Sequence, residues 1–520
     1  MNKNFALNII RNQYNKEIGK DRKFKNIRSF FYMSEKEKYT IDDDTWNDMD
    51  MDRVYEKLDR TYSTPGESVL YYMLRNPLHD EGELKKRDKL IEIFKSNQSL
   101  REELLYILFE LSIDSKNDFL YMIENELIVN KFKYYLYTIL GKIRIISIIL
   151  IFLFGSKFVL MLGISLYINM FINSKERELI KSRGILYLKD IIKASKKILN
   201  IKDDSIKEYR DNLNINLKEV RDIDASIFLI KFINVWQGIF EFMSVLFLIE
   251  ECAYYKVSGK LKGKEKYLMK IFQFIGELDS LLSIAGYQNN LKETHVKPEF
   301  IKEVSLNIKD GNHLLLDNPV ANSICIKDKG VVLTGTNMSG KSTFLRMLGV
   351  NIILAQTFYF TLAKEYKAPF FNIVSSISPN DNLLKGKSYY MAEAEGILRI
   401  INAIKKELPV FCPIDEIFRG TNPIERIAMS AEILTYINNN KTVPIVATHD
   451  RELADTLKES YEFYYFSEDV DSKNGLNFDY KLKSGVTQSR NAIKLLDYLG
   501  YPKELIKGAY RRAENIEGFI

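Results

Sequence analysis

Residues 335 to 342 read Gly-Thr-Asn-Met-Ser-Gly-Lys-Ser, which fits the Gly-x-x-x-x-Gly-Lys-Ser pattern of a phosphate-binding loop. The apolar run 331–333 comes before it, and an apolar pattern with helical spacing follows from Phe344. A strand, a glycine turn and a helix therefore stand in the order that lets backbone N–H groups and a helix N-terminus face an anion. The loop predicts a nucleoside triphosphate site in an α/β domain. The alternative is an ordinary glycine turn, which the flanking strand and helix disfavour.

The loop supplies the candidate nucleotide-binding residues. Lys341 adds a positive charge for the phosphates, and the Ser342 hydroxyl is suited to Mg²⁺. We therefore expect ATP and Mg²⁺ as cofactors. The predicted nucleotide-binding residues are Gly335, Thr336, Asn337, Met338, Ser339, Gly340, Lys341, Ser342 and Thr343.

Two adjacent carboxylates follow the apolar run 410–414 and predict hydrolysis in addition to binding. Asp415 is the candidate Mg²⁺ ligand, and Glu416 is the candidate group that polarises the attacking water. Pro413 lies just before them, and proline cannot donate a hydrogen bond within a sheet. We expect it to interrupt the strand locally without removing the site.

His449 is the second candidate catalytic residue. The buried-strand pattern 443–447 ends in Thr448-His449-Asp450, which places the imidazole at a strand end where it could sense the γ-phosphate. A lone histidine is more often structural, but this chain has only 4 histidines and this one follows a strand of the predicted ATPase.

These residues resemble the MutS family, the ABC-type ATPases of DNA mismatch repair. The loop 334–343 is close to the family's Asn-Met-x-Gly-Lys-Ser-Thr form, and 415–422 resembles its extended acidic motif. The stretch 381–393 resembles the signature segment, in which a serine of one subunit contacts the γ-phosphate held by the other; the matching residue is Ser388. Asn322 matches an asparagine in the segment leading into the ATPase sheet, and so joins the nucleotide-binding candidates. The resemblance implies a homodimer with a composite ATP site that works on DNA.

The resemblance extends into the N-terminal half. The stretches 45–52, 58–61 and 65–67 are similar to the start of the family's helical core domain, and 274–281 is similar to its end. This core pattern begins within the first fifty residues, and no Phe-x-Glu occurs near the start. Full members of the family read mismatches with a Phe-x-Glu wedge in a domain before the core, so we expect no direct mismatch recognition. The interval between the two core ends is too short for full lever helices and a DNA-gripping clamp, so we expect no encirclement of DNA.

Composition predicts a multidomain α and α/β protein. The chain has 520 residues, of which 46% are apolar. The stretch 68–290 is poor in Pro and Gly and has helical apolar spacing, whereas the C-terminal half alternates strands and helices, as a mostly parallel sheet does. The predicted domains are a basic arm at 1–38, a helical core-and-lever domain at 39–295 and a P-loop ABC-type ATPase domain at 296–520.

Charge and cysteine content narrow the function classes. The 3 cysteines form no close pair, which argues against a zinc site or a disulfide framework. A net charge of +6 is mild, so nucleic-acid binding needs a local basic face. The arm offers one, and a solvated, frayed tail is the alternative. Its basic residues are Lys16, Lys20, Arg22, Lys23, Lys25 and Arg28. Without an apolar segment near the start, we expect a cytoplasmic location.

One segment is too apolar for a soluble lever. An apolar hairpin at 143–173 consists of two nearly uncharged runs separated by Gly155-Ser156-Lys157. Spanning the bilayer needs about 20 apolar residues, so the first arm would have to extend back through Lys142 and Arg144. Basic residues on both flanks favour a membrane hairpin with both ends in the cytoplasm. The alternative is a helix pair buried in the core or at a subunit interface.

The sequence thus favours a MutS-like ATPase that couples ATP hydrolysis at a dimeric site to conformational change, on DNA and without reading mismatches. The alternative is a membrane-associated mechanical or scaffolding ATPase that does not recognise DNA. An ABC importer or exporter subunit is a weaker third hypothesis, because the nucleotide-domain motifs are of MutS type and the hairpin is too small for a transport pathway.

Overall fold

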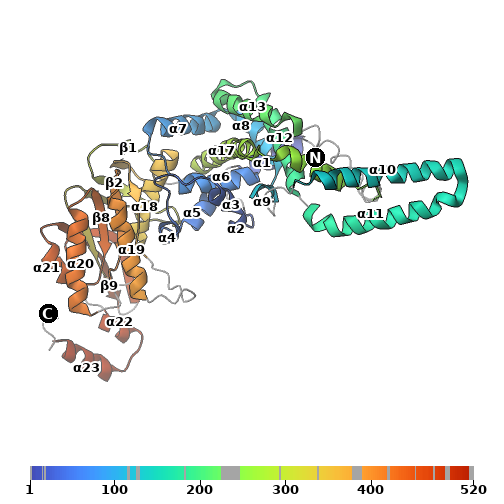
Figure 1. Ribbon diagram of the computed structural model, residues 1–520. Helices are drawn as coiled ribbons and strands as arrows, with labels where there is room; N and C mark the ends of the chain where they lie inside the picture. Colours follow the sequence, from blue (N-terminus) through green and yellow to red (C-terminus); the bar gives the residue numbers. More distant parts are fainter. Residues whose placement is uncertain are drawn as a thin grey trace. The chain divides into compact units, whose positions relative to one another are not determined.

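The chain divides into two compact units, each described by itself (Figure 1). The first unit comprises 1–35, 58–72 and 89–290, and the second comprises 36–57, 73–88 and 291–520. Residues 39–57 and 73–88, which the sequence analysis assigned to the helical domain 39–295, thus cluster with the C-terminal part, as do residues 36–38 of the predicted arm. The boundaries at 38 and 295 stay a prediction. The computed structural model describes residues 3–14, 16, 19–113, 118–124, 129–180, 183–223, 246–291, 294–335, 339–377, 389–418, 422–450, 452–471, 475–486 and 492–514.

The first unit is helical throughout its described residues, as the sequence predicted. Helices α6 (Thr64–Arg75) and α7 (Glu81–Ser96) each have residues in both units. The other helices of the first unit are α1 (Lys3–Gln13), α2 (Phe24–Ile27), α3 (Ser29–Met33), α8 (Gln98–Leu111), α9 (Asp118–Glu124), α10 (Lys131–Phe154), α11 (Val159–Ile180), α12 (Arg183–Leu199), α13 (Lys207–Glu219), α16 (Ile249–Leu261) and α17 (Glu265–Asn289), with 3-10 turns η1 (Gly155–Phe158) and η2 (Asp204–Ile206).

Helix α17 lies at the buried centre of this unit and is hydrogen-bonded to the residues just before α6. The carboxylate of Asp279 is fully buried and accepts hydrogen bonds from the backbone N–H groups of Tyr62 and Ser63, at 3.1 and 2.9 Å, and from the Ser63 hydroxyl at 2.6 Å. These bonds satisfy donors that precede the first turn of α6. Gly276, one turn earlier, lets the two helices approach closely, because a Cβ there would lie 2.4 Å from the Pro65 carbonyl oxygen.

The N-terminal arm is packed into the first unit. Two of its six basic residues therefore belong neither to a nucleic-acid face nor to a solvated, frayed tail. The ammonium of Lys20 lies 2.8 Å from Asp59 and 2.9 Å from Glu67. The guanidinium of Arg22 lies 3.0 Å from Asp59, whose side chain is fully buried. Both positive charges therefore form ion pairs within the first unit. A nucleic-acid face on the arm could therefore use only the remaining basic residues.

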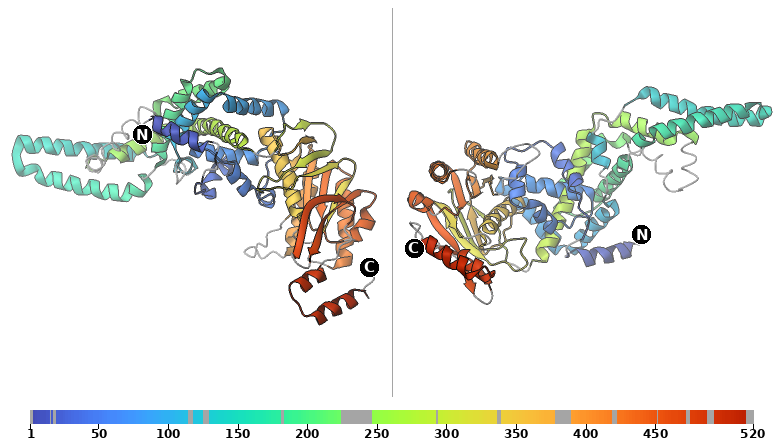
Figure 2. Two further views of the ribbon diagram at one scale, coloured as in Figure 1. Left: turned by 180° about the vertical axis from the view of Figure 1, so that it is seen from behind. Right: turned by 90° about the horizontal axis from the view of Figure 1, so that it is seen from below.

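Helices α10 and α11 form the predicted apolar hairpin (Figures 1 and 2). Asn130 caps the start of α10 by accepting the N–H of Lys133 at 2.9 Å, and Gly155 ends it with a φ of +78°. The first arm does extend back through Arg144. Among the described residues, the helical stretch Lys131–Glu176, which contains both arms, is long and apolar enough to cross a membrane. Only 6% of its most apolar part is buried, so the alternative of a helix pair inside this chain's core is wrong.

The second unit is built on two sheets. The larger has the order β10-β9-β4-β8-β7-β6; its neighbours are parallel except β9 and β10, which confirms the predicted mostly parallel sheet. The smaller, β1-β5-β2-β3, is mixed and was not predicted. The strands are β1 (Glu299–Phe300), β2 (Leu306–Gly311), β3 (Asn322–Ile326), β4 (Gly330–Thr334), β5 (Glu365–Ala368), β6 (Asn372–Ile373), β7 (Val410–Asp415), β8 (Thr442–Ala447), β9 (Tyr461–Asp471) and β10 (Gly475–Ser484).

Helices cover the larger sheet (Figure 2). Side chains of β4, β7 and β8 such as Val332, Cys412 and Val446 form one core with α19 and α20. Alternate residues of these strands point to the other face, where α18 packs on β7 and β8. The helices of this unit are α4 (Asp43–Asp48), α5 (Met51–Leu58), α18 (Lys341–Phe358), α19 (Tyr389–Ile404), α20 (Pro423–Asn438), α21 (Glu452–Leu457), α22 (Ala492–Tyr498) and α23 (Lys503–Glu514).

Pro413 lies inside β7, and the interruption it causes falls on one side of the strand. On the β8 side the register is continuous from Val410 to Asp415. On the other side, β6 stops at Ile373 and pairing resumes only as an isolated bridge between Ser376 and Ile414. The expected local interruption thus lies between β7 and the short edge strand β6, and leaves the pairing of β7 with β8 intact.

The α6–α17 crossing generates the first prediction. Substituting Gly276→Ala should lower the free energy of unfolding by about 1–3 kcal/mol, because the new methyl group has no room beside the Pro65 carbonyl. The matched control is Gly259→Ala in α16, where the nearest atom to a new Cβ is 4.0 Å away, and where alanine should be neutral or stabilising. Chemical denaturation of both purified variants measures this. Equal unfolding midpoints would contradict the close approach.

Candidate functional site

The predicted phosphate loop lies between β4 and α18. Gly335 follows the strand with a φ of +144°, and Gly340 precedes the helix with a φ of +108°. Both values are in the region that favours glycine. The ammonium of Lys341 is buried and donates to the carbonyl of Gly335 at 2.7 Å, so its charge lies over the loop. Thr336, Asn337 and Met338 lie outside the described residues.

Ser339 marks the place where an anion fits. Its side chain is 1% exposed, and its Oγ has no hydrogen-bond partner among the residues that the structure describes. An unpartnered buried hydroxyl is costly unless a ligand or water satisfies it. It lies beside the N-terminus of α18, whose unpaired N–H groups attract anions. The donor set thus fits a phosphate group.

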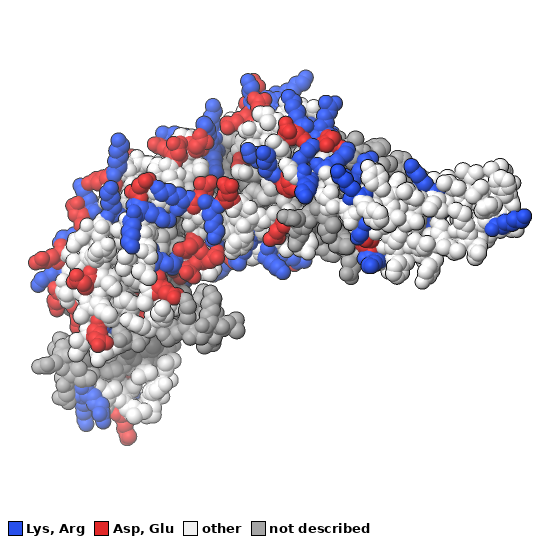
Figure 3. Space-filling model, in the orientation of Figure 1, with Lys and Arg blue, Asp and Glu red and all other residues white. Residues whose placement is uncertain are grey.

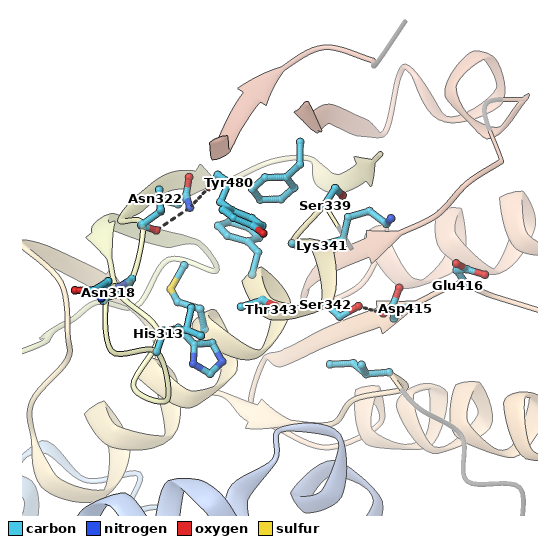
Figure 4. Close-up of a pocket in the computed structure, with 18 of the residues that line it drawn as sticks. His313, Asn318, Asn322, Ser339, Lys341, Ser342, Thr343, Asp415, Glu416 and Tyr480 are labelled. Atoms are coloured by element: carbon cyan, nitrogen blue, oxygen red, sulfur yellow. Dashed lines mark hydrogen bonds between the residues drawn. The ribbon is translucent and has the colours of Figure 1, made fainter. Parts of the chain in front are cut away.

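The candidate Mg²⁺ ligands meet although 73 residues separate them (Figure 4). The hydroxyl of Ser342, in the first turn of α18, donates a hydrogen bond to Oδ2 of Asp415, at the end of β7. A hydroxyl and a carboxylate are oxygen ligands of the kind that Mg²⁺ prefers. The pair is therefore in place to hold the ion beside the phosphate loop.

Glu416 and His449 come from the ends of adjacent strands, β7 and β8. Nε2 of His449 lies 3.0 Å from Oε1 of Glu416. Glu416 has a φ of +55°, an uncommon conformation for a non-glycine residue, and its N–H donates to the carbonyl of Ala447 at 2.8 Å. Backbone strain of this kind occurs at functional sites, where it sets the direction of a side chain. The structure thus brings the two predicted catalytic residues together.

These groups line one cavity of about 900 Å³. The cavity unites most of the predicted site, and the described part of its lining does not include Gly335. The predicted residues that line it are Asn322, Ser339, Gly340, Lys341, Ser342, Thr343, Asp415, Glu416 and His449. The sequence missed several lining residues, notably His313, Phe466 and Tyr480. Of these, only Tyr480 had a signal in the sequence, because the stretch 480–485 resembles the closing strand of the MutS-family ATPase domain. Ser388 lies outside the described residues, so its position relative to the cavity stays a prediction.

Asn322 acts on the backbone of β10. Its side-chain amide donates to the carbonyl of Tyr480 at 2.9 Å, and its Oδ1 accepts the N–H of Leu482 at the same distance. These bonds support a bulge in β10 at which Tyr480 has a φ of +52°. The Tyr480 ring lies 3.3 Å from the position of a Cβ at Gly340, beside the phosphate loop (Figure 4). Asn322 therefore positions an aromatic wall of the cavity.

His313 forms another part of the wall as a neutral imidazole. Burial, and next the positive charge of Arg346, lower its pKa to about 4. Its Nδ1 accepts the N–H of Leu315 at 3.1 Å, which fixes the ring orientation. Near pH 7 the side chain therefore adds no charge to the cavity.

The depressed pKa of His313 predicts a pH dependence of stability. The unfolded histidine titrates near its ordinary value of 6.5 and the folded one near 4, so the unfolded state binds more protons between these values. Stability from this residue is full above pH 6.5 and is lost as the pH falls toward 4. By pH 5 the loss should be about 1–2 kcal/mol. His313→Gln should reduce the difference between denaturation midpoints at pH 7.5 and 5; an unchanged difference would contradict the assignment.

Comparisons with known proteins agree with this geometry. Residues 331–517 match the family model described as MutS domain V. The DNA mismatch repair protein MutS of Fusobacterium nucleatum is 32% identical over 276 residues, which are 50% of this chain and 30% of that protein. MutS of Listeria monocytogenes is 31% identical over 275 residues, or 50% and 31% of the two chains. DNA mismatch repair protein MSH3 of Lodderomyces elongisporus is 31% identical over 285 residues, or 48% and 28%. The chain therefore spans about a third of the length of these relatives.

Proposed function

We propose that this chain, a member of the MutS family through its domain V, is a Mg²⁺-dependent ATPase. In this proposal it couples ATP hydrolysis to conformational change on DNA. The observation that carries the proposal is the convergence of Lys341, Ser342, Asp415, Glu416 and His449 on one cavity. The relatives named above are DNA mismatch repair proteins, which supports DNA as the partner. A cytoplasmic location is proposed with it.

The proposed mechanism assigns one task to each residue. Mg²⁺ held by Ser342 and Asp415 would neutralise charge on the phosphates. Lys341 and the N-terminus of α18 bind and orient the phosphate chain. Glu416 orients and polarises the attacking water, and His449, at 3.0 Å, holds that carboxylate in position.

Substitutions at Glu416 and Lys341 should separate hydrolysis from binding. Glu416→Gln should bind ATP as the parent does, because the loop is intact, while turnover falls on the order of a hundredfold or more. Lys341→Ala should weaken ATP binding itself, because a charge contact to phosphate is lost. Nucleotide binding and phosphate release are measured on the same preparations. Parent-like turnover in Glu416→Gln would remove that residue from the proposed role.

We further propose an ATP-stabilised homodimer in which Ser388 of one subunit completes the site of the other, as the resemblance of 381–393 implies. A Lys341→Ala chain and a Ser388→Arg chain should each be inactive alone. Their mixture should regain about a quarter to half of the parent's turnover per active site, because one of the two composite sites in a mixed dimer is intact. Light scattering checks that mixed dimers form; dimers without recovered activity would argue against sharing.

A second candidate function is a membrane-associated mechanical or scaffolding ATPase that does not recognise DNA. The observation that favours it is the exposed apolar surface of the hairpin 143–173. The two candidates differ in what stimulates turnover. Duplex, mismatched and branched DNA should raise ATP hydrolysis under the first, and lipid vesicles alone should do so under the second.

A further inference from the structure

The hairpin 143–173 has its polar groups inside and its apolar groups outside. The buried positions of α10 are Tyr137, Gly141, Arg144 and Ser147, which recur on one face at helical spacing. The opposite face of this part of α10 carries isoleucines that are each about half exposed, including Ile145, Ile146, Ile148 and Ile149. A helix pair made for water has the opposite arrangement.

The inward-facing polar side chains donate hydrogen bonds to backbone carbonyls of the same unit, while Nε of Arg144 and Oδ1 of Asn169 have no hydrogen-bond partner among the described residues. The guanidinium of Arg144 is 2% exposed and donates to the carbonyls of Ser165, at 3.0 Å, and Leu246. Asn169, also buried, donates to the same Leu246 carbonyl at 2.7 Å. In hydrocarbon, polar groups persist when they are turned toward protein partners in this way.

The base of the hairpin is closed by an internal ion pair. The carboxylate of Glu176 is buried and lies 2.6 Å from the ammonium of Lys133. It also accepts hydrogen bonds from the hydroxyls of Tyr137, at 2.9 Å, and Tyr255, at 2.7 Å. The charge of Glu176 is therefore neutralised inside. A second buried acid, Glu251, accepts a hydrogen bond from the Asn173 side chain at 2.8 Å. Between residues 143 and 173 the sequence contains no Asp or Glu.

The distribution of the apolar groups indicates lipid as their partner, not a second protein surface. Exposed side chains of α11 include Leu160, Met161, Ile164, Met170 and Phe171. At about 100° per residue they cover about half of the helix circumference, as the isoleucines do on α10. A partner helix would cover a stripe of roughly 100°. Figure 3 shows the protruding hairpin as almost uniformly uncharged, with basic groups at its tip.

The positions of Lys142 and Lys157 indicate how deeply the hairpin would enter a bilayer. At about 1.5 Å per residue, α10 rises about 18 Å from Lys142 to Phe154, and Lys157 follows at the tip. Both lysines are exposed. The hydrocarbon core of a bilayer is about 30 Å thick, and the missing 12 Å is roughly what two lysine stems of about 6 Å cover when they snorkel in opposite directions.

We propose that the hairpin spans a lipid bilayer, entering and leaving on the ATPase side, with Lys142 at the near headgroup layer and Lys157 at the far one. This inference deepens the second candidate function and rests on it. The probe is the full chain reconstituted into vesicles of three parts phosphatidylcholine to one part phosphatidylglycerol. ATP hydrolysis by each preparation is measured as a check of folding.

Flotation tests membrane attachment. The parent should float with the vesicles at high salt, because burial of apolar groups is not screened. Ile148→Glu should reduce the floating fraction at least tenfold. The matched control is Ile215→Glu in α13, where an equally exposed isoleucine lies outside the hairpin and the parent's behaviour should persist. If the parent stays in solution as a dimer, or Ile148→Glu floats like the parent while hydrolysing ATP, lipid attachment is overturned.

Labelling tests the spanning depth separately. A membrane-impermeant maleimide trapped in the vesicle lumen should label Lys157→Cys and give no signal with the parent. The same reagent outside should label the exposed native Cys325 of the ATPase unit. A floating Lys157→Cys chain that is labelled at position 157 from outside, or is not labelled there from the lumen, would overturn the spanning geometry and leave membrane attachment standing.

Discussion

The candidate ATPase site depends on one contact, the hydrogen bond from Ser342 to Asp415. The serine belongs to the helix that follows β4, and the aspartate ends β7, with β8 lying between these strands in the sheet. Because all three strands are parallel, their carboxyl ends meet at one edge. The contact therefore brings the phosphate loop and the acidic strand end together, and His449 at the end of β8 lies beside Glu416 as a consequence of the same order.

The other wall of the cavity has a different origin. Asn322 at the start of β3 binds the backbone of β10 across a bulge, and this fixes Tyr480 next to the phosphate loop. The stretch 375–377 is held within the same unit by Asp48, whose buried carboxylate accepts hydrogen bonds from the Ser375 hydroxyl at 2.6 Å and from the N–H of Ile377 at 2.9 Å. Ile377 lines the cavity, so Asp48, from the segment 36–57, helps to position one wall of the candidate nucleotide site.

The first unit buries polar groups under two different conditions. In the α6–α17 crossing, Asp279 is surrounded by backbone donors inside a core whose outer surface faces water. In the hairpin, Arg144 and Asn169 are paired inside while isoleucines and leucines are outside. Each arrangement pairs buried polar side chains with other groups of the protein, and the second has an apolar exterior.

The sequence by itself determined the phosphate loop, the acidic pair, the mostly parallel sheet and the apolar hairpin, because each depends on a local pattern: glycines at fixed spacing, carboxylates after an apolar run, or an unbroken stretch of isoleucine and leucine. Tertiary structure alone decided the use of Lys20 and Arg22 in internal ion pairs, the roles of His313 and Tyr480, and the inward orientation of Arg144. These depend on partners far away in the chain, such as Asp59, Gly340 and Leu246, and no local spacing specifies which distant residue will lie within hydrogen-bonding distance.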